Sequence, residues 1–345
     1  MKNILLFLYL ILSFSSISIA QKNFNDYAQF YPIGEDPNIR YMSSYVKQEK
    51  ILFEANPTVR YSVYNNVMRG LMEEYKHTQA WYVSFRPQLR MYNENSFPIK
   101  TPSYKMFLGT QHLFRIKTNK VSAKIQEFVG FSFETGHYSN GQDGCAFSTL
   151  YADDSKECDS IYKAITSSSN LSDMLNRKNG NFSTNLSELI LNYRWYRLDK
   201  NNEPKEMHSV NGGYTLYHKR AFGLVNFGGY SDQDIKIFGQ NRFSIGYEYM
   251  NVFKDGEGVR ISFKQNVEII QGAHKQVNPI RTETIFTVYP FVNYKKFIVR
   301  PIAIGLFISY VYGHDNYNYR FVDSGNQITC GISWTQFPPF VMKKN

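Results

Sequence analysis

The chain of 345 residues lacks the features that mark several common protein classes. Beyond its first twenty residues it has no apolar run of about 18 residues, which excludes a bundle of membrane-spanning helices. It has no Cys-x-x-Cys pair and no phosphate-binding glycine loop, and most of its histidines lack the paired spacing of metal ligands (His208, His218, His274 and His314). Charged residues make up only 20%, while 27 Tyr and 27 Phe supply groups to bury, which excludes a disordered chain.

The chain is basic, with a formal net charge of +10, but the positive charge is scattered. No block of five or more Lys or Arg residues occurs, so the sequence does not predict binding to nucleic acid. Scattered positive charge suits an anionic lipid surface equally well. Charge alone therefore does not identify the partner.

The first twenty residues have the layout of a secretory signal peptide. Lys2 precedes an apolar core from Ile4 to Leu12, and the Ser-Ile-Ala sequence at 18–20 predicts cleavage before Gln21. The alternative is a membrane anchor, for which the apolar core is short. The mature chain is therefore expected in an oxidising compartment, where disulfides persist.

The rest of the sequence alternates between apolar and polar residues in segments separated by polar turns, which is the pattern of β-strands. Ile261 and Phe263, for example, alternate with Arg260 and Lys264. The segment at 207–230 is long and could instead be a hairpin that turns at His218-Lys219. Twelve strands are predicted, an even number, at 38–47, 57–67, 79–92, 102–116, 122–139, 184–198, 207–230, 241–252, 257–270, 281–293, 296–312 and 326–337.

A soluble β-sandwich would show the same alternation, but three features favour a membrane barrel. The segments are longer, at about 10–16 residues, than the five or six of average soluble strands. One face carries charges such as Arg260, Lys264 and Glu268, which suit a polar lumen. Aromatic residues cluster near segment ends, for example Tyr310 and Tyr312, as they do at membrane interfaces. The predicted fold is all-β, a twelve-stranded antiparallel transmembrane β-barrel with a long extracellular loop.

The predicted organisation is a signal peptide at 1–20, a periplasmic lead-in at 21–37, a barrel at 38–337 and a C-terminal tail at 338–345. Residues 140–183 interrupt the alternation, because they are rich in Ser, Asn, Asp and Gly. They are expected to form an extracellular loop inserted between two strands. Cys145 and Cys158 lie within this loop and are expected to pair, whereas Cys330 lies in an alternating run and is expected to stay a thiol.

A polar cluster is predicted on the outer face of the barrel beside this loop. The odd positions of the strand at 122–139 are mainly apolar and face outward, so His137 and Ser139 also point outward. Asn185 belongs to the outward series of the next strand, and antiparallel pairing brings it beside His137. A Ser–His–Asn set can perform nucleophilic acyl transfer, since the imidazole takes the serine proton and the amide orients the imidazole. The alternative is that all three are polar rim residues.

The sequence Gly-His-Tyr-Ser-Asn-Gly-Gln at 136–142 resembles the His-x-Ser-Asn-Gly signature of the outer-membrane phospholipase A family. The segments at 95–98 and 107–109 and the closing run at 310–333 also resemble that family. The resemblance implies a twelve-stranded outer-membrane barrel that hydrolyses acyl ester bonds of phospholipids, depends on calcium and acts as a dimer. It assigns the nucleophile to Ser139, the general base to His137 and the residue that orients the imidazole to Asn185.

The resemblance also implies a calcium site, which would stabilise the oxyanion together with a backbone N–H near 140–141. By position, the ligands in one subunit would be the backbone carbonyl of Gln142 and the side chain of Asn181. A partner subunit would contribute near Glu94, and such an all-oxygen set suits calcium. The 140–183 loop departs from the family pattern, because it lengthens the interval between the serine and the asparagine where the ligands are expected.

The sequence therefore predicts a phospholipase of the Gram-negative outer membrane, with its active site toward the outer leaflet. The expected partners are membrane phospholipids and a second copy of the chain. A catalytically inactive barrel that acts as a channel or structural protein is one alternative, and channel conductance without hydrolysis would favour it. A soluble secreted β-protein is the other, and recovery of the mature chain without detergent would favour it.

Overall fold

The computed structural model describes residues 36–47, 49–67, 70, 75–95, 98–116, 125–198, 204–221, 225–226, 228–253, 259–290 and 302–336. The predicted signal peptide, nearly all of the lead-in and the C-terminal tail lie outside the described residues and stay predictions. None of the helices in the described part of the chain is long and apolar enough to cross a membrane.

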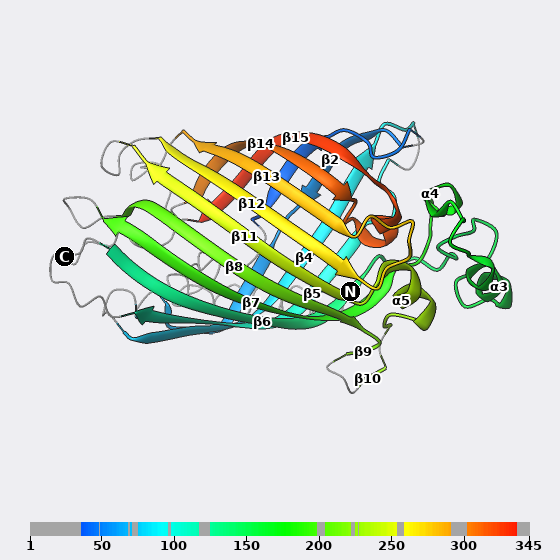
Figure 1. Ribbon diagram of the computed structural model, residues 1–345, viewed down its shortest axis with the longest axis horizontal. Coiled ribbons are helices and arrows are strands. Elements are labelled where there is room, and N and C mark those ends of the chain that lie inside the picture. Colours follow the sequence, from blue (N-terminus) through cyan, green and yellow to red (C-terminus); the bar gives the residue numbers. More distant parts are fainter. Residues whose placement is uncertain are drawn as a thin grey trace, which may run out of the picture.

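Thirteen strand segments form one closed antiparallel sheet (Figure 1). The sheet closes because β1 pairs with β15 on one side and with β2 on the other. β2 and β3 pair with successive parts of β4 and together make one strand of the wall. The fold is thus an all-β barrel of twelve antiparallel strands, as predicted. The segments are β1 (Asn38–Met42), β2 (Ile51–Asn56), β3 (Val59–Asn65), β4 (His77–Tyr92), β5 (Ser103–Ile116), β6 (Ile125–Ser139), β7 (Ser183–Leu198), β8 (Pro204–His218), β11 (Asn241–Val252), β12 (Arg260–Gln271), β13 (Ile280–Tyr289), β14 (Ile302–His314) and β15 (Ser324–Gln336).

The interruption between β2 and β3 lies at Pro57 and Thr58. Proline has no N–H group to donate to a neighbouring strand, so the hydrogen-bond ladder is broken there. The predicted strand at 57–67 was therefore too short at its beginning, since the wall strand starts at Ile51.

The prediction of one strand over 207–230 was wrong, and the alternative turn at His218-Lys219 describes the chain better. β8 ends at His218, and a two-stranded hairpin follows, formed by β9 (Arg220–Ala221) and β10 (Val225–Asn226). Helix α5 (Asp232–Phe238) comes next and begins with a capping box between Ser231 and Asp234. Figure 1 shows α5 at the end of the barrel, near the β9–β10 hairpin.

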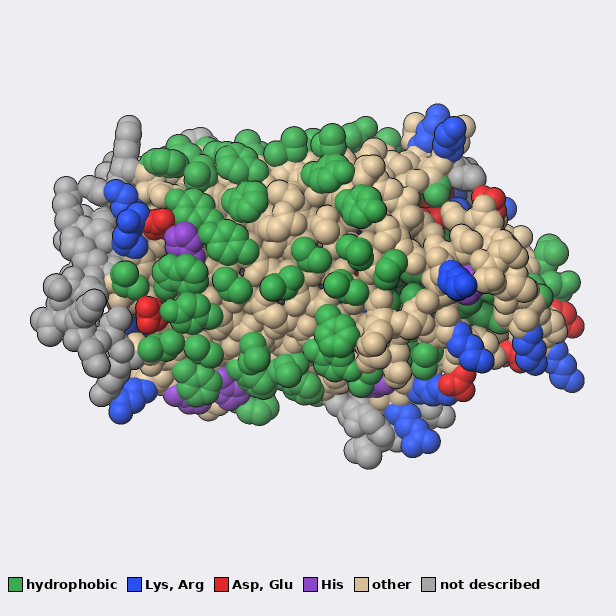
Figure 2. Space-filling model, in the orientation of Figure 1, with side chains coloured by type: hydrophobic (Ala, Val, Ile, Leu, Met, Phe, Trp, Pro, Cys, Tyr) green, Lys and Arg blue, Asp and Glu red, His purple; other side chains and the backbone are tan. Residues whose placement is uncertain are grey.

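Side chains alternate across the barrel wall as the sequence pattern predicts. In β4, Trp81, Val83 and Phe85 are exposed, while Tyr82 and Ser84 between them are buried. Figure 2 shows hydrophobic side chains spread over the outer wall and charged side chains mainly toward its two ends. An apolar wall between charged ends is the surface of an outer-membrane barrel.

Buried ion pairs fill much of the interior. Arg40 and Arg90 contact the two carboxylate oxygens of Glu54 at 2.6 and 2.5 Å, and Arg90 also contacts Asp315 at 2.6 Å. Pairing of this kind is what permits charges to lie away from bulk water.

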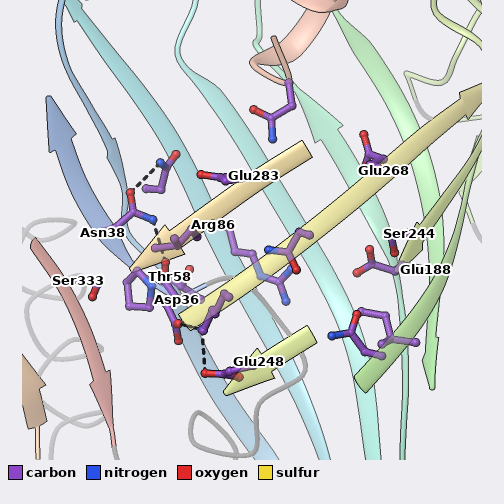
Figure 3. A pocket seen from close by; sticks show the side chains of 18 of the residues that line it. Asp36, Asn38, Thr58, Arg86, Glu188, Ser244, Glu248, Glu268, Glu283 and Ser333 are labelled. Atoms are coloured by element: carbon purple, nitrogen blue, oxygen red, sulfur yellow. Dashed lines mark hydrogen bonds and ion pairs between the residues drawn. The ribbon is translucent and has the colours of Figure 1, made fainter. Parts of the chain in front are cut away.

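A cavity of about 580 Å³ remains inside the barrel. Arg260, Lys264 and Glu268, which were predicted to face a lumen, line it. Figure 3 shows acidic and basic side chains from several strands around the cavity, among them Arg86 and Glu188. The polar interior distinguishes this barrel from a soluble β-sandwich with a dry core.

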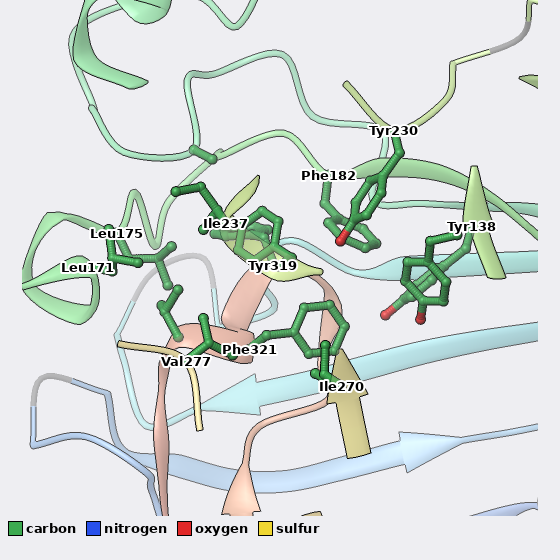
Figure 4. Close-up of a cluster of buried hydrophobic side chains, with 14 of the residues drawn as sticks. Tyr138, Leu171, Leu175, Phe182, Tyr230, Ile237, Ile270, Val277, Tyr319 and Phe321 are labelled. Atoms are coloured by element: carbon green, nitrogen blue, oxygen red, sulfur yellow. The ribbon is translucent and has the colours of Figure 1, made fainter. Parts of the chain in front are cut away.

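One end of the barrel is covered by a hydrophobic cap. The loop after β6 contributes α3 (Lys156–Ala164) and α4 (Leu171–Met174), and the connection between β14 and β15 contributes the 3₁₀-helix η1 (Asn318–Val322). Cys145 and Cys158 form a disulfide within this loop. Figure 4 shows buried side chains of the loop, α5, η1 and the strand ends packed together. The cap cluster consists of Phe107, Tyr138, Ala146, Phe147, Leu171, Leu175, Phe182, Leu186, Tyr217, Tyr230, Ile237, Phe238, Ile270, Val277, Tyr319, Phe321 and Val322.

Candidate active site on the outer wall

His137 and Ser139 lie at the cap end of β6, on the face that points away from the lumen. The alternate residues Glu134 and Tyr138 are buried on the inner side, whereas Phe133 on the outer side is exposed. His137 and Ser139 continue the outer series and are half-buried. Both side chains therefore face the region that lipid would occupy.

Tyr138 anchors this end of β6 from the inside. Its hydroxyl donates to Oε1 of Gln88 at 3.1 Å and accepts the backbone N–H of Asn318 in η1 at 2.8 Å. Tyr138 also packs edge-on against Phe182 in the cap, with ring centroids 4.9 Å apart. The cap thus fixes the backbone between the two outward-facing residues.

Asn185 of β7 lies directly opposite His137 in the strand register. Its Oδ1 atom lies 3.1 Å from Nδ1 of the imidazole, and its Nδ2 atom donates to the carbonyl of Lys219 at 3.1 Å. Because a carbonyl can only accept, the amide is oriented with its oxygen toward His137. Nδ1 of His137 then carries the proton, which leaves Nε2 as the basic atom of the neutral ring.

Ser139 lies two residues from His137 on the same face of the same strand, about 7 Å away at Cα. Within the described part of the chain, the Ser139 hydroxyl forms no hydrogen bond. Hydrogen bonds between catalytic groups are often long before substrate binds, so a Ser139 hydroxyl without a partner is compatible with a catalytic pair. The structure thus brings His137 and Asn185 into contact and places Ser139 beside them.

The segment after β8 lies over the site. Ser183, the register partner of Ser139, donates to the carbonyl of Gly228. Gly228 has φ +40°, and a Cβ atom at this position would lie 3.3 Å from Cε1 of His137 and 2.9 Å from Oγ of Ser183. The positive φ and these two close contacts favour glycine beside the imidazole.

Of the three backbone N–H groups that follow Ser139, two already donate hydrogen bonds to described residues. The N–H of Asn140 donates to the Phe182 carbonyl at 3.0 Å, and the N–H of Gln142 donates to Oδ1 of Asn140 at 3.2 Å. The N–H of Gly141, a residue with φ +64°, donates to no described residue. Of the amides near 140–141 that were predicted to hold an oxyanion, Gly141 is the one that can still donate.

Two of the three residues predicted to bind calcium, Gln142 and Asn181, lie in the cap loop between β6 and β7. The N–H of Asn181 donates to the Gly144 carbonyl at 2.6 Å, which holds Asn181 near Gln142. Nδ2 of Asn181 donates to Oδ2 of Asp153 at 2.7 Å and leaves the amide oxygen as a possible ligand. Burial raises the pKa of the Asp153 carboxyl, and Asp154 adds to this effect. The predicted donors are all oxygen atoms, which is the type of ligand that calcium takes.

Glu94 lies in the loop after β4, away from the other two candidates in sequence. It forms an ion pair with Lys100 of the same chain at 2.5 Å. The ion pair between Glu94 and Lys100 would have to break before Glu94 could bind an ion on a second copy of the chain. No group of three or more His, Cys, Asp or Glu side chains within the described ranges is placed to hold a metal ion.

No protein-family model matches the chain, and no curated protein sequence matches it. Among solved structures, the outer membrane phospholipase A from Escherichia coli is similar, with a TM-score of 0.45 and 11% identity over 92% of this chain and 98% of that chain. The Salmonella typhi outer membrane phospholipase dimer with bound calcium has a TM-score of 0.44 and 12% identity, over 92% and 98%. The NanC porin has a TM-score of 0.39 and 12% identity, over 87% and 98%. Since phospholipases and a porin match at similarly low levels, these similarities carry no argument about activity.

Sequence reasoning missed the contributions of Lys219 and Gly228. Both come from a segment that was predicted to be strand, and both act through the backbone. The Lys-Arg pair at 219–220 and the Gly-Gly pair at 228–229 were the available signals of an irregular segment. Sequence reasoning also set His218 aside, although this residue has a contact on the same outer wall.

Proposed function

We propose that this chain is an outer-membrane phospholipase that hydrolyses acyl ester bonds of phospholipids, with A1, A2 and lysophospholipase-type activity. The observation that carries the proposal is the 3.1 Å contact between Nδ1 of His137 and Oδ1 of Asn185 on the outer wall, with Ser139 on the same face. Polar groups are costly where a barrel meets lipid, so three chemically matched ones call for a function. The motif at 136–142 supports the same assignment.

The mechanism follows from the orientation of the imidazole. Asn185 accepts the Nδ1 proton and so presents Nε2 to the Ser139 hydroxyl. As Oγ attacks the ester carbonyl carbon, its proton passes to Nε2, and the resulting imidazolium then protonates the departing alcohol oxygen. Water repeats the sequence on the acylated serine and releases the fatty acid. An amide stabilises the imidazolium less than a carboxylate does, so the site depends strongly on its oxyanion donors.

Calcium, when bound, would supply positive charge to the developing oxyanion. The residues that would hold it are Gln142 through its backbone carbonyl, Asn181 through its amide oxygen and Glu94 of a second copy. The N–H of Gly141 would donate to the same oxyanion, because it is not engaged by the loop. A second copy would complete the ion's ligands, which makes the homodimer the active form.

The site would face the outer leaflet of a Gram-negative outer membrane. Two exposed apolar residues of β5, Tyr104 and Met106, lie opposite Ser139 and His137 in the register, so substrate would reach Ser139 laterally from the lipid and not through the lumen. Membrane phospholipids are accordingly the proposed substrates. Gating by a second copy and by calcium would protect the host membrane from constant hydrolysis.

The alternative function is that of an inactive barrel that conducts solutes. The hydrophobic cap argues against a channel, because aromatic side chains such as Phe182 and Phe321 pack across the cap end of the barrel. The polar cavity inside the barrel is the one observation in its favour.

The experiment that tests the proposal is fatty acid release from phospholipid in mixed micelles by the refolded mature chain. We expect release with calcium present and loss of release with a chelator. The same preparation is then inserted into planar bilayers. Steady conductance without any release of fatty acid would favour the channel, and release that survives the chelator would remove calcium from the mechanism.

A further inference from the structure

A second serine–histidine contact lies on the outer wall beside the first. Nε2 of His218, the last residue of β8, lies 3.1 Å from Oγ of Ser187 on β7. Nδ1 of the same ring lies 2.7 Å from the carbonyl oxygen of Arg220. Both side chains are half-buried and face outward, since Ser187 continues the outer series of Asn185.

The Arg220 carbonyl determines the proton position on His218. A carbonyl oxygen can only accept, so Nδ1 carries the proton and Nε2 of the neutral ring has the lone pair. The Ser187 hydroxyl therefore donates to Nε2. This is the hydrogen bond that a general base makes with a serine nucleophile, and a main-chain carbonyl here takes the orienting role that Asn185 has for His137.

Thr135 of β6 completes the arrangement. Its Oγ1 lies 2.9 Å from Oγ of Ser187 and 3.2 Å from the carbonyl of Leu186. Because the Leu186 carbonyl can only accept, the Thr135 hydroxyl donates to it. Thr135 therefore contacts Ser187 Oγ from the β6 side, while the proton of Ser187 is directed to His218 on the β8 side.

The register places this set next to the proposed active site. Asn185 lies opposite His137 on β6 and opposite His218 on β8. Ser187 is two residues further along β7, so both serines face the same strip of the wall. A lipid ester that reaches one of them also reaches the neighbourhood of the other.

We propose that Ser187 is a second acyl-accepting nucleophile of this chain, with His218 as its general base and lipid acyl esters as its substrates. The identity of the substrate rests on the proposed function, whereas the reactivity of the serine does not. Ser187 Oγ would bond to the carbonyl carbon while its proton passes to Nε2 of His218. The imidazolium would then protonate the alcohol oxygen as the ester C–O bond breaks, and water would release the acid by the same route.

The test is covalent labelling with a fluorophosphonate in detergent micelles, followed by intact-mass counting and peptide mapping. The serine Oγ–P bond forms as the P–F bond breaks, and fluoride leaves while the proton passes to the imidazole. The chains compared are the wild type, Ser139→Ala, Ser187→Ala and His218→Gln, each shown to be a folded barrel by its heat-sensitive gel mobility.

We expect Ser139→Ala to take one adduct, located on Ser187, and His218→Gln to lower the rate of that labelling by about 10²-fold. Ser183 serves as an internal control, because it lies on the same strand face and donates to Gly228. An adduct on Ser187 but none on Ser183 supports the inference.

Absence of an adduct from Ser187 in every folded chain overturns the inference, as does labelling of Ser187 that is unchanged in His218→Gln. The two proposals fail separately in this experiment. An adduct on Ser139 alone would leave the proposed function intact and remove Ser187. An adduct on Ser187 alone would remove Ser139 as the nucleophile and keep the second one.

Discussion

Asn185 holds the imidazole of His137 by a 3.1 Å contact between Oδ1 and Nδ1, and the two residues are direct partners in the register of β6 and β7. The orientation of the amide depends on a third residue, since its Nδ2 donates to the carbonyl of Lys219. The contact therefore joins the wall of the barrel to the segment that follows β8. Both ends of the Asn185 amide are thus engaged, the oxygen with the imidazole and the nitrogen with the Lys219 carbonyl.

Asn185→Ala should lower kcat for phospholipid hydrolysis by about 10²-fold with little change in KM, because the imidazole loses its preferred orientation. Asn185→Asp should retain more activity, since a carboxylate also accepts the Nδ1 proton. Steady-state kinetics in mixed micelles measure both variants.

Asn192→Ala is the matched control for this prediction. Asn192 lies on the same strand but is buried on the inner face, where its Nδ2 donates to Ser209 at 2.7 Å. The Asn192→Ala variant should change the free energy of unfolding and keep kcat within about twofold of the wild-type value. Equal losses of kcat in Asn185→Ala and Asn192→Ala would mean that the effect comes from the barrel and not from the imidazole.

Gly228→Ala should reduce turnover by about tenfold, because the new Cβ would press on Ser183 and on the His137 ring, and small displacements of catalytic groups cost rate. Gly272→Ala is the control. Gly272 also has positive φ, at +82°, but a Cβ there meets nothing within 4 Å. Loss of turnover in both variants would point to backbone strain as the cause and contradict the proposed contact.

The strand pattern predicted the wall of the barrel because each side chain there has one of two surroundings, lipid or lumen. His137 and Asn185 could be placed on one face by the same reasoning. Pro57 could have indicated the break in the second wall strand, since its missing N–H is a local property. These features depend on residues close together in the sequence.

The segment after β8, which lies over the site, could not be predicted in this way. The residues after His218 leave the wall because Tyr230 and Phe238 pack into the cap with Phe182, and these contacts join distant parts of the chain. Likewise, the bond from Asn318 to Tyr138 spans 180 positions. Long-range packing of this kind has no signal in local periodicity.

Cys145→Ser should destabilise the cap loop by about 3 kcal/mol, the amount expected when a link across thirteen positions is lost. The loop should become more sensitive to protease while the barrel keeps its heat-sensitive gel mobility. Cys330→Ser, which removes the exposed thiol of β15, should leave protease sensitivity unchanged. Equal protection in Cys145→Ser and wild type would show that the cap does not need the disulfide.

Glu49→Gln should destabilise the cap by about 3 kcal/mol, because it leaves Arg320 buried without its carboxylate. Burial alone would raise the pKa of Glu49, but Arg320 and Arg177 outweigh it and hold this pKa below the ordinary value of 4.5. The carboxylate therefore stabilises the cap above about pH 4.5, and this contribution is lost as the pH falls through the lowered pKa. Hydrogen exchange of cap amides in micelles, followed from pH 7 to pH 3, measures it.

In the Glu49→Gln variant, hydrogen exchange of the cap amides should lose the pH dependence that the Glu49 carboxylate contributes. Asp232→Asn is the comparison, since the Asp232–Lys219 pair is exposed and should change exchange only slightly. An acid response that is the same in wild type and Glu49→Gln would assign the response to other groups.

The most direct test of the central claim is the initial rate of fatty acid release from phospholipid by Ser139→Ala and by wild type. Both are measured in the same calcium-containing micelles after each is shown to be a folded barrel. We predict release by the wild type and a fall of about 10²-fold or more in Ser139→Ala, with any remainder removed by Ser187→Ala. Release by Ser139→Ala at the wild-type rate, or none by the folded wild type, would contradict this prediction.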